Sequence, residues 1–220
     1  MNERGCNPRM DFNLYLITDR KGSAGRPLLT VVEEALKGGV TAVQLREKDL
    51  PGRDLYELAI GMRSLTQRYG AKLFINDRID IALAVDADGV HLGEKSIPPD
   101  ITRSLLGEEK LIGISCHSAE GVVTAREKGA DFITFGPVYF TPSKAAYGEP
   151  VGLDSLGEIT RIARLPVFAI GGINSSNALE VVSAGAHGIA LISAILAADN
   201  PRRESETLLA LLNSDHRQGQ

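Results

Sequence analysis

The sequence lacks the features that would direct it to a membrane, to nucleic acid or out of the cell. No apolar run reaches the roughly 18 residues that a membrane span needs. The opening stretch, MNERGCNPRM, has no apolar core and is not typical of a signal peptide. Lys and Arg form no tract and the formal net charge is −4, which argues against nucleic acid or an anionic membrane as the main partner.

Cysteine is also scarce. The chain has two, Cys6 in a polar segment and Cys116 in an apolar run, so we expect no disulfide between them. Such usage fits a reducing compartment, and we therefore expect a cytoplasmic protein.

The composition shows no break and no linker. Of the 220 residues, 43% are hydrophobic and 24% are charged, which is enough to bury a sizeable core. We expect one domain over residues 1–220, with an N-terminal tail over 1–11 and a C-terminal tail over 213–220.

Short apolar segments alternate with amphipathic ones along the whole chain. The apolar segments are typical of strands covered on both faces of a parallel sheet, and they span residues 12–18, 42–47, 72–77, 89–93, 110–115, 132–138, 166–172 and 188–193. The predicted helices span residues 28–39, 54–70, 78–87, 99–108, 119–130, 154–164, 177–186 and 202–214. Eight such units predict a closed (β/α)₈ TIM barrel. The alternative is an open doubly wound sheet, but no GxGxxG motif follows the first strand.

Polar side chains follow several of the predicted strands. Active sites of (β/α)₈ barrels lie at the C-terminal ends of the strands, so these side chains would meet at one mouth. In chain order they are Gln44, Arg46, Lys48, Asn76, Asp77, Arg78, His91, Glu94, Lys95, Ser96, Ser115, His117, Ser118, Thr141, Ser143 and Lys144. Independent structural accidents would scatter over both ends of the barrel, so the convergence favours a ligand site.

Several candidates also have an explanation that needs no ligand. Arg46 and Lys48 could form a solvated salt-bridge cluster with Glu47. Asp77 could cap the helix that follows it, because Asp favours that position. His117 could be a histidine whose hydrogen bonds are satisfied inside the barrel.

Two glycines follow the seventh strand. Gly171 and Gly172 precede the polar segment NSSN, where backbone amides and a helix start could approach an anion. A tight turn alone would also need glycine. Because the loops after strands seven and eight commonly bind phosphate in such barrels, we favour a phosphate site that includes Ile192 and Ser193.

The segment FITFGPVYFTPSKAAYGEPVGL, residues 132–153, leads from the sixth strand into a long polar loop. This loop carries Thr141, Ser143 and Lys144, and with Arg46 and Lys48 it would form a second anion site. We interpret it as a mobile cover that brings these groups over an anion and excludes water.

Taken together, the motifs resemble the thiamine phosphate synthase family, which also contains thiazole tautomerases of the same fold. The resemblance rests on VQLREKD, FINDRIDIALAVDADGVHLG, IGISCHS, GPVYFTPSK, AIGGI and GIALISAI, in the family's order over residues 15–196. It implies a reaction that joins 4-amino-5-hydroxymethyl-2-methylpyrimidine diphosphate to a thiazole phosphate and releases pyrophosphate. Mg²⁺ is the implied cofactor, the partners are these small phosphorylated substrates, and a homo-oligomer is left open.

The resemblance also implies individual roles. The implied substrate-binding residues are Gln44, Arg46, Lys48, Asn76, Ser115, Thr141, Ser143, Lys144, Gly172, Ile192 and Ser193. The implied catalytic residues are Lys48, Ser115, His117 and Lys144, and Asp77 is the implied Mg²⁺ ligand.

One position departs from the family pattern. Synthases usually have a second Mg²⁺ carboxylate after the fourth strand, where this chain has Ser96 in HLGEKS, although Glu94 could substitute. Loss of a carboxylate should weaken Mg²⁺ binding and favours a metal-independent thiazole tautomerase as the alternative. In that enzyme a histidine such as His117 would move a proton, whereas Lys144 favours a synthase. A third reading is a non-catalytic barrel that binds phosphorylated metabolites.

Overall fold

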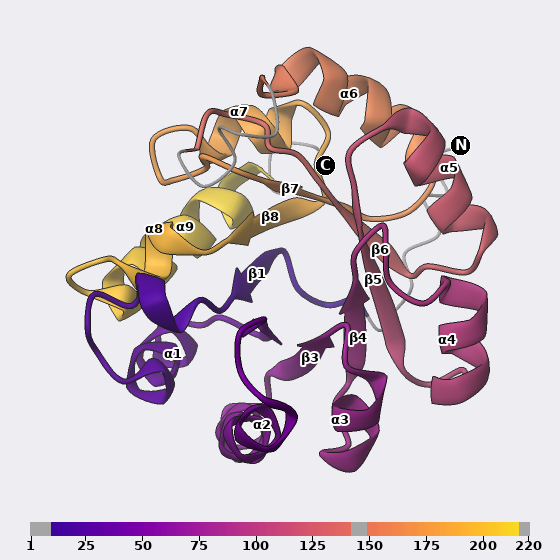
Figure 1. The fold of residues 1–220 in the computed structure, drawn as a ribbon. Helices are drawn as coiled ribbons and strands as arrows, with labels where there is room; N and C mark the ends of the chain where they lie inside the picture. The colour runs from indigo at the N-terminus through magenta and orange to yellow at the C-terminus, as the bar shows by residue number, and fades with distance from the viewer. Residues whose placement is uncertain (1–9, 142–148, 216–220) are drawn as a thin grey trace.

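The computed structural model describes residues 10–141 and 149–215. Its strands form a closed parallel barrel in sequence order, with β1 paired to β8 (Figure 1). The strands are β1 (Leu14–Ile17), β2 (Ala42–Leu45), β3 (Lys72–Asn76), β4 (Gly89–Leu92), β5 (Leu111–Cys116), β6 (Phe132–Phe135), β7 (Val167–Ile170) and β8 (Gly188–Leu191). The predicted (β/α)₈ barrel is therefore confirmed, and the alternative prediction of an open doubly wound sheet is wrong.

Helices surround the barrel (Figure 1). They are α1 (Leu28–Lys37), α2 (Gly52–Arg68), α3 (Ile79–Ala84), α4 (Pro99–Leu106), α5 (Ala119–Glu127), α6 (Gly152–Ala163), α7 (Ala178–Ser183), α8 (Ser193–Leu196) and α9 (Pro201–Asp215). The short α8 and a 3₁₀ turn, η1 (Arg20–Gly22), are two elements that the sequence pattern did not predict. Neither is long enough to show a helical period.

Both chain ends described here are more ordered than the expected tails. Met10 is 3% exposed and packs with Phe12 under the barrel. At the other end α9 continues to Asp215, and Asn13 donates a hydrogen bond to the side chain of Asn213 at 3.2 Å. This contact lies inside the range 213–220 that was expected to be a tail.

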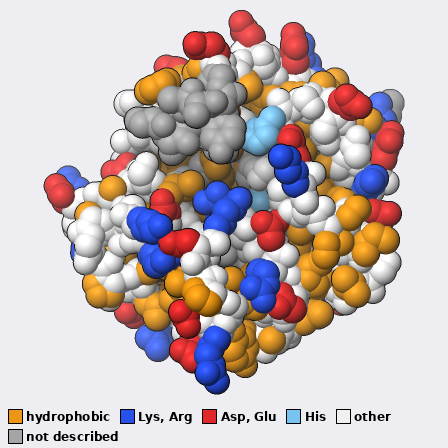
Figure 2. Space-filling model, in the orientation of Figure 1, with side chains coloured by type: hydrophobic (Ala, Val, Ile, Leu, Met, Phe, Trp, Pro, Cys, Tyr) orange, Lys and Arg blue, Asp and Glu red, His pale blue; other side chains and the backbone are white. Residues whose placement is uncertain are grey.

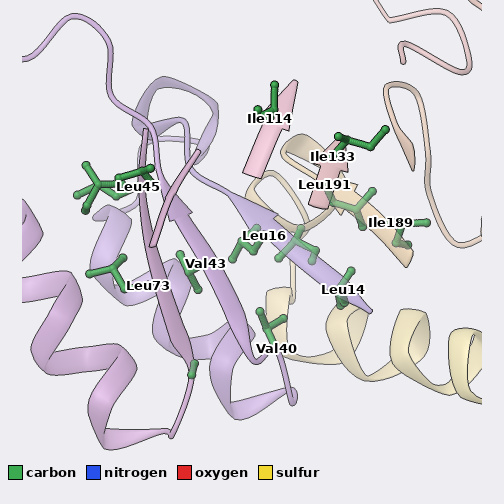
Figure 3. Close-up of a cluster of buried hydrophobic side chains, with 14 of the residues drawn as sticks. Leu14, Leu16, Val40, Val43, Leu45, Leu73, Ile114, Ile133, Ile189 and Leu191 are labelled. Carbon is green, nitrogen blue, oxygen red and sulfur yellow. The ribbon is translucent and has the colours of Figure 1, made fainter. Parts of the chain in front are cut away.

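Alternate residues of each strand face two separate cores, as a period of two requires. Outward-facing residues such as Leu14, Leu16 and Val43 pack against the helices (Figure 3). Inward-facing residues form a second cluster that is mainly aromatic, and its fully buried rings are Tyr15, Phe74, Phe132 and Phe168. With Phe12, these rings fill the barrel interior with centroid separations of 5.1 to 6.0 Å.

None of the helices within the described ranges is both long and apolar enough to cross a membrane.

Gly113 of β5 tests how tightly this interior is packed. A Cβ at Gly113 would collide with the ring of Phe132 and would lie 2.6 Å from Nδ1 of His91. We expect Gly113→Ala to lower the free energy of unfolding by about 1–3 kcal/mol, which is typical of overpacking. The control is Gly157→Ala in α6, where the nearest atom would be 3.6 Å away. Because alanine favours helix, we expect the control to be neutral or stabilising by up to about 1 kcal/mol in urea unfolding. Equal effects of the two changes would contradict the tight packing.

Candidate functional site at the C-terminal mouth of the barrel

The structure brings the predicted site residues to one end of the barrel. Each lies at the C-terminal end of a strand or just after it; they are Gln44, Arg46, Lys48, Asn76, Asp77, Glu94, Ser96, Ser115, His117, Thr141, Gly172, Ile192 and Ser193. Ser143 and Lys144 lie outside the described residues. Lys and Arg side chains, with Asp and Glu among them, gather around a hollow near the middle of one face of the molecule (Figure 2).

Glu47 does not belong to a solvated cluster with Arg46 and Lys48. It is 5% exposed, and its carboxylate accepts hydrogen bonds from Thr18 Oγ1 at 2.8 Å and from the backbone and guanidinium of Arg20 at 3.0 and 3.1 Å. Among the described residues, no side chain pairs with the charged groups of Arg46 or Lys48. The salt-bridge alternative is therefore wrong, and both cations remain available for an anion.

Asp77 is not a helix cap. The residue at the cap position of α3 is Arg78, and no side chain caps that helix. Asp77 instead has a φ of 60°, a left-handed conformation that Asp tolerates better than most residues. Its Oδ2 accepts from Asn76 at 2.8 Å, and its Oδ1 accepts from the amide of Gly93 at 3.3 Å. This unusual backbone orients the carboxylate across the ends of β3 and β4.

Ser96 contacts Asp77 directly. Its hydroxyl donates to Oδ1 of Asp77 and accepts from the amide of Gly93 at 2.7 Å. Ser96, the position that departs from the family pattern, therefore places a hydroxyl next to the carboxylate of Asp77. A second carboxylate at this position would repel Asp77 unless a cation lay between them. Glu94 is exposed and extends toward α5, where its Oε1 would lie 4.0 Å from a Cβ at Gly121. Among the described residues, no hydrogen bond joins Glu94 to Asp77 or Ser96.

A groove of about 390 Å³ adjoins the mouth between the segment after β4 and helix α5. Ser96 and Ser115 line it together with Glu94 and Glu120. Cys116, which also lines it, is 1% exposed, and burial raises the pKa of its thiol to about 12. The thiol is therefore protonated and unreactive at neutral pH.

Beneath the mouth, a layer of buried polar side chains covers the aromatic interior. Gln44 Nε2 donates to Tyr15 Oη at 3.1 Å, and Tyr15 Oη lies 3.5 Å from Nδ1 of His91. Nε2 of His91 lies 3.0 Å from Ser115 Oγ, to which Thr134 Oγ1 donates at 3.3 Å. Burial lowers the pKa of His91 to about 3, so its ring is neutral at physiological pH.

Sequence reasoning found Gln44 and Ser115 in this layer but missed Tyr15 and Thr134. Both belong to strands that read as continuously apolar. Period-two alternation, which places them on the inward face with Gln44, is the signal that identifies them.

His117 is exposed and is therefore not a buried barrel histidine. Its Nδ1 lies 2.6 Å from the carbonyl oxygen of Gly136. Because a carbonyl can only accept, Nδ1 carries a hydrogen in this contact, and Nε2 is the ring atom left to exchange a proton with a ligand.

The two glycines after β7 are required by close packing with the segment after β6. Gly171 and Gly172 have φ values of 99° and 67°. A Cβ on Gly171 would lie 2.5 Å from Pro137, and one on Gly172 would lie 2.7 Å from Tyr139. The tight-turn explanation is thus sufficient for the glycines, and phosphate binding here stays a prediction. Ile192 and Ser193 follow β8, the strand paired with β7, at the start of the unpredicted helix α8.

A sequence model described as thiamine monophosphate synthase matches residues 14–195. The chain belongs to the thiamine monophosphate synthase family. A Geobacter sulfurreducens relative is 62% identical over 93% of this chain and 96% of its own length. The thiamine-phosphate synthase of Clostridium novyi is 47% identical over 90% of this chain and 98% of its own. Thiamine phosphate pyrophosphorylase from Pyrococcus furiosus aligns with a TM-score of 0.83 at 42% identity, covering 92% and 96% of the two chains. The resemblance based on motifs is confirmed.

For this member of the family, the structure predicts that Glu47 orders the first two loops of the mouth. We expect Glu47→Gln to lower the melting temperature clearly, because an amide offers one acceptor oxygen where Thr18 and Arg20 supply three donors. The control is Asp49→Asn, which removes the exposed carboxylate that also pairs with Arg20. Exposed ion pairs contribute little, so we expect the control to melt close to the unmodified protein. A larger loss from Asp49→Asn would contradict this assignment.

Proposed function

We propose that the protein is a thiamine phosphate synthase, which joins the pyrimidine diphosphate to thiazole phosphate and releases pyrophosphate. The observation that carries the proposal is the combination, at one mouth, of an aimed carboxylate and an unpaired cation. Asp77 and Arg46 both lie close enough to His91 to influence its pKa, Asp77 raising it and Arg46 lowering it. The names of the Clostridium novyi and Pyrococcus furiosus relatives support the same activity.

The reaction breaks the bond between the pyrimidine methylene carbon and the diphosphate oxygen, and the electron pair leaves with the diphosphate. The lone pair of the thiazole nitrogen then forms the new C–N bond. Such a dissociative step needs mainly charge stabilisation of the leaving group, which Arg46 and Lys48 supply from β2. Lys144 would add a third cation from the loop after β6.

The remaining residues would position the two substrates. Gln44, Asn76 and Ser115 would contact the pyrimidine diphosphate. Thr141 and Ser143 would bind its phosphates, while Gly172, Ile192 and Ser193 would hold the thiazole phosphate through backbone amides. His117 would act through Nε2 on a proton near the thiazole.

The donor set fits one Mg²⁺ that also binds substrate. Asp77 supplies a carboxylate and Ser96 a hydroxyl oxygen beside it, and Mg²⁺ is commonly held by one or two carboxylates together with substrate phosphates. When bound, the ion would neutralise charge on the departing diphosphate. Because Ser96 replaces the second carboxylate, we expect the site to bind Mg²⁺ more weakly than a site with two carboxylates would.

The first test is incubation with both phosphorylated substrates, with and without Mg²⁺. We expect thiamine phosphate and an equal amount of pyrophosphate with Mg²⁺, and at least about a hundredfold less in EDTA, because charge stabilisation of this kind contributes several kcal/mol. Lys144→Ala should abolish coupling. Unchanged coupling in EDTA would contradict the role of the ion, and absence of thiamine phosphate under both conditions would contradict the proposal.

The second test restores the missing carboxylate. We expect Ser96→Asp to lower the Mg²⁺ concentration for half-maximal coupling by about tenfold, since ligand charge sets the affinity of such sites. Glu94→Gln is the control and should leave this concentration unchanged, because Glu94 extends toward α5. A response to Glu94→Gln but none to Ser96→Asp would show that Glu94 is the second ligand.

Ser96 also favours one alternative, a thiazole tautomerase that acts on thiazole phosphate carboxylate without metal. His117 would be its proton carrier, held by the carbonyl of Gly136. Tautomerase turnover would survive EDTA and would be lost in His117→Ala, whereas coupling would not occur. Cytoplasmic location remains part of the proposal and is supported by the cysteine usage, whereas a homo-oligomer is left open.

A further inference from the structure

A continuous row of hydrogen-bonding side chains crosses the interior of the barrel. It runs from Gln44 through Tyr15 and His91 to Ser115, with contacts of 3.1, 3.5 and 3.0 Å. Tyr15 is fully buried, and Gln44 and His91 are 1% and 2% exposed. Because water does not reach Tyr15 or the ring of His91, the hydroxyl hydrogen of Tyr15 and the ring N–H must be used by neighbours on the row, whereas Ser115 is only partly buried.

The orientation of the Gln44 amide, with Nε2 toward Tyr15, sets the direction of the row. Tyr15 Oη receives a hydrogen from the amide of Gln44, so its own hydrogen is directed to Nδ1 of His91. A neutral imidazole has a single N–H, which then lies on Nε2 and donates to Ser115 Oγ. Thr134 donates to the same oxygen at 3.3 Å, and its Oγ1 also lies 3.4 Å from Nε2 of His91, where it can accept from the ring N–H. Ser115 thus accepts twice within the barrel, and its own hydrogen is left for a group outside the row.

The two ends of the row are coupled. Among the described residues, Nε of Arg63 is the one fully buried side-chain nitrogen or oxygen that has no hydrogen-bond partner. Oε1 of Gln44 also has no partner among these residues, yet it is not fully buried, so it keeps some contact with solvent at the mouth. In this order Gln44 presents an acceptor and Ser115 a donor. Reversal of the row would exchange both at once, so that Gln44 would present its NH₂ group and Ser115 a lone pair.

We propose that this row selects the amino form of the pyrimidine, with Tyr15 and His91 as positioning residues. The inference rests on the proposed function, which supplies the pyrimidine. A 4-aminopyrimidine has an N–H donor beside an unprotonated ring nitrogen, which suits an acceptor on Gln44 and a donor on Ser115. The 4-oxo counterpart has a carbonyl beside a ring N–H. It would place an acceptor against the acceptor on Gln44 and a donor against the donor on Ser115.

The direction of the row can be measured without any substrate. The experiment is ¹H–¹⁵N NMR of the ring nitrogens of His91 in the full-length protein, assigned by comparison with His91→Gln. We expect the Nε2–H tautomer with Nδ1 unprotonated. In Tyr15→Phe, which removes only the hydroxyl, we expect a mixture of tautomers. The Nδ1–H tautomer in the unmodified protein would overturn the proposal.

Selectivity is measured by titration with the 4-amino and 4-oxo pyrimidine diphosphates and with inorganic pyrophosphate. We expect the unmodified protein to prefer the amino form by about a hundredfold or more, because mismatched buried polar groups are left unpaired. Tyr15→Phe should reduce this preference at least about tenfold and leave the affinity for pyrophosphate unchanged. Tyr69→Phe is the control, since its hydroxyl bonds Glu33 at 3.0 Å, away from the barrel interior.

The outcomes separate the two proposals. If the unmodified protein binds neither pyrimidine, the proposed function fails, and the selectivity fails with it whatever the tautomer. If it prefers the amino form and Tyr15→Phe keeps the same preference, the row is overturned while the proposed function stands. If Tyr15→Phe does not fold, His91→Gln takes its place in the titration and should lose the preference in the same way.

Discussion

The aromatic filling of the barrel is the constraint on which the rest of the structure depends. Eight short strands close on themselves, and a packed set of rings from Phe12 to Phe168 occupies the space they enclose. The barrel is therefore a solid core with one polar end and not a channel. Inward-facing polar side chains have room only above the rings, so Gln44, His91 and Ser115 form a layer between the rings and the mouth.

Charged residues that are close in sequence have different environments at the mouth. Arg46 and Glu47 are adjacent in sequence just after β2, but Glu47 is buried and hydrogen-bonded whereas Arg46 is half-buried. The carboxylate of Glu47 is bound by Thr18 and Arg20, which follow β1 at the edge of the mouth. Arg46 and Lys48 remain for a ligand at the mouth, together with the carboxylate of Asp77, whose backbone is left-handed. This is the distribution expected for a site that holds an anion and a hard cation together.

Much of this arrangement could be predicted from the sequence. The eight apolar runs were sufficient for the barrel, because strands buried on both faces carry a strong signal. The common end of the site residues followed from the topology alone. The short helix α8, the φ of Asp77 and the separation of Glu47 from Arg46 depend on tertiary packing, which local pattern does not contain. The hydroxyl contact between Ser96 and Asp77 could not be foreseen either, although Ser96 was identified as the unusual position. The predicted Ser143 and Lys144 lie outside the described residues.

The central claim is that ligand binds at the mouth, above the aromatic core. It is tested most directly by mapping amide chemical-shift changes in the ¹⁵N-labelled protein during titration with thiamine phosphate and Mg²⁺. We expect the largest changes at the C-terminal ends of the strands, including Arg46, Asp77, Ser115 and Gly172, and none around Met10 and Phe12. Changes centred on the N-terminal end of the barrel, or confined to the outer helices, would contradict the account.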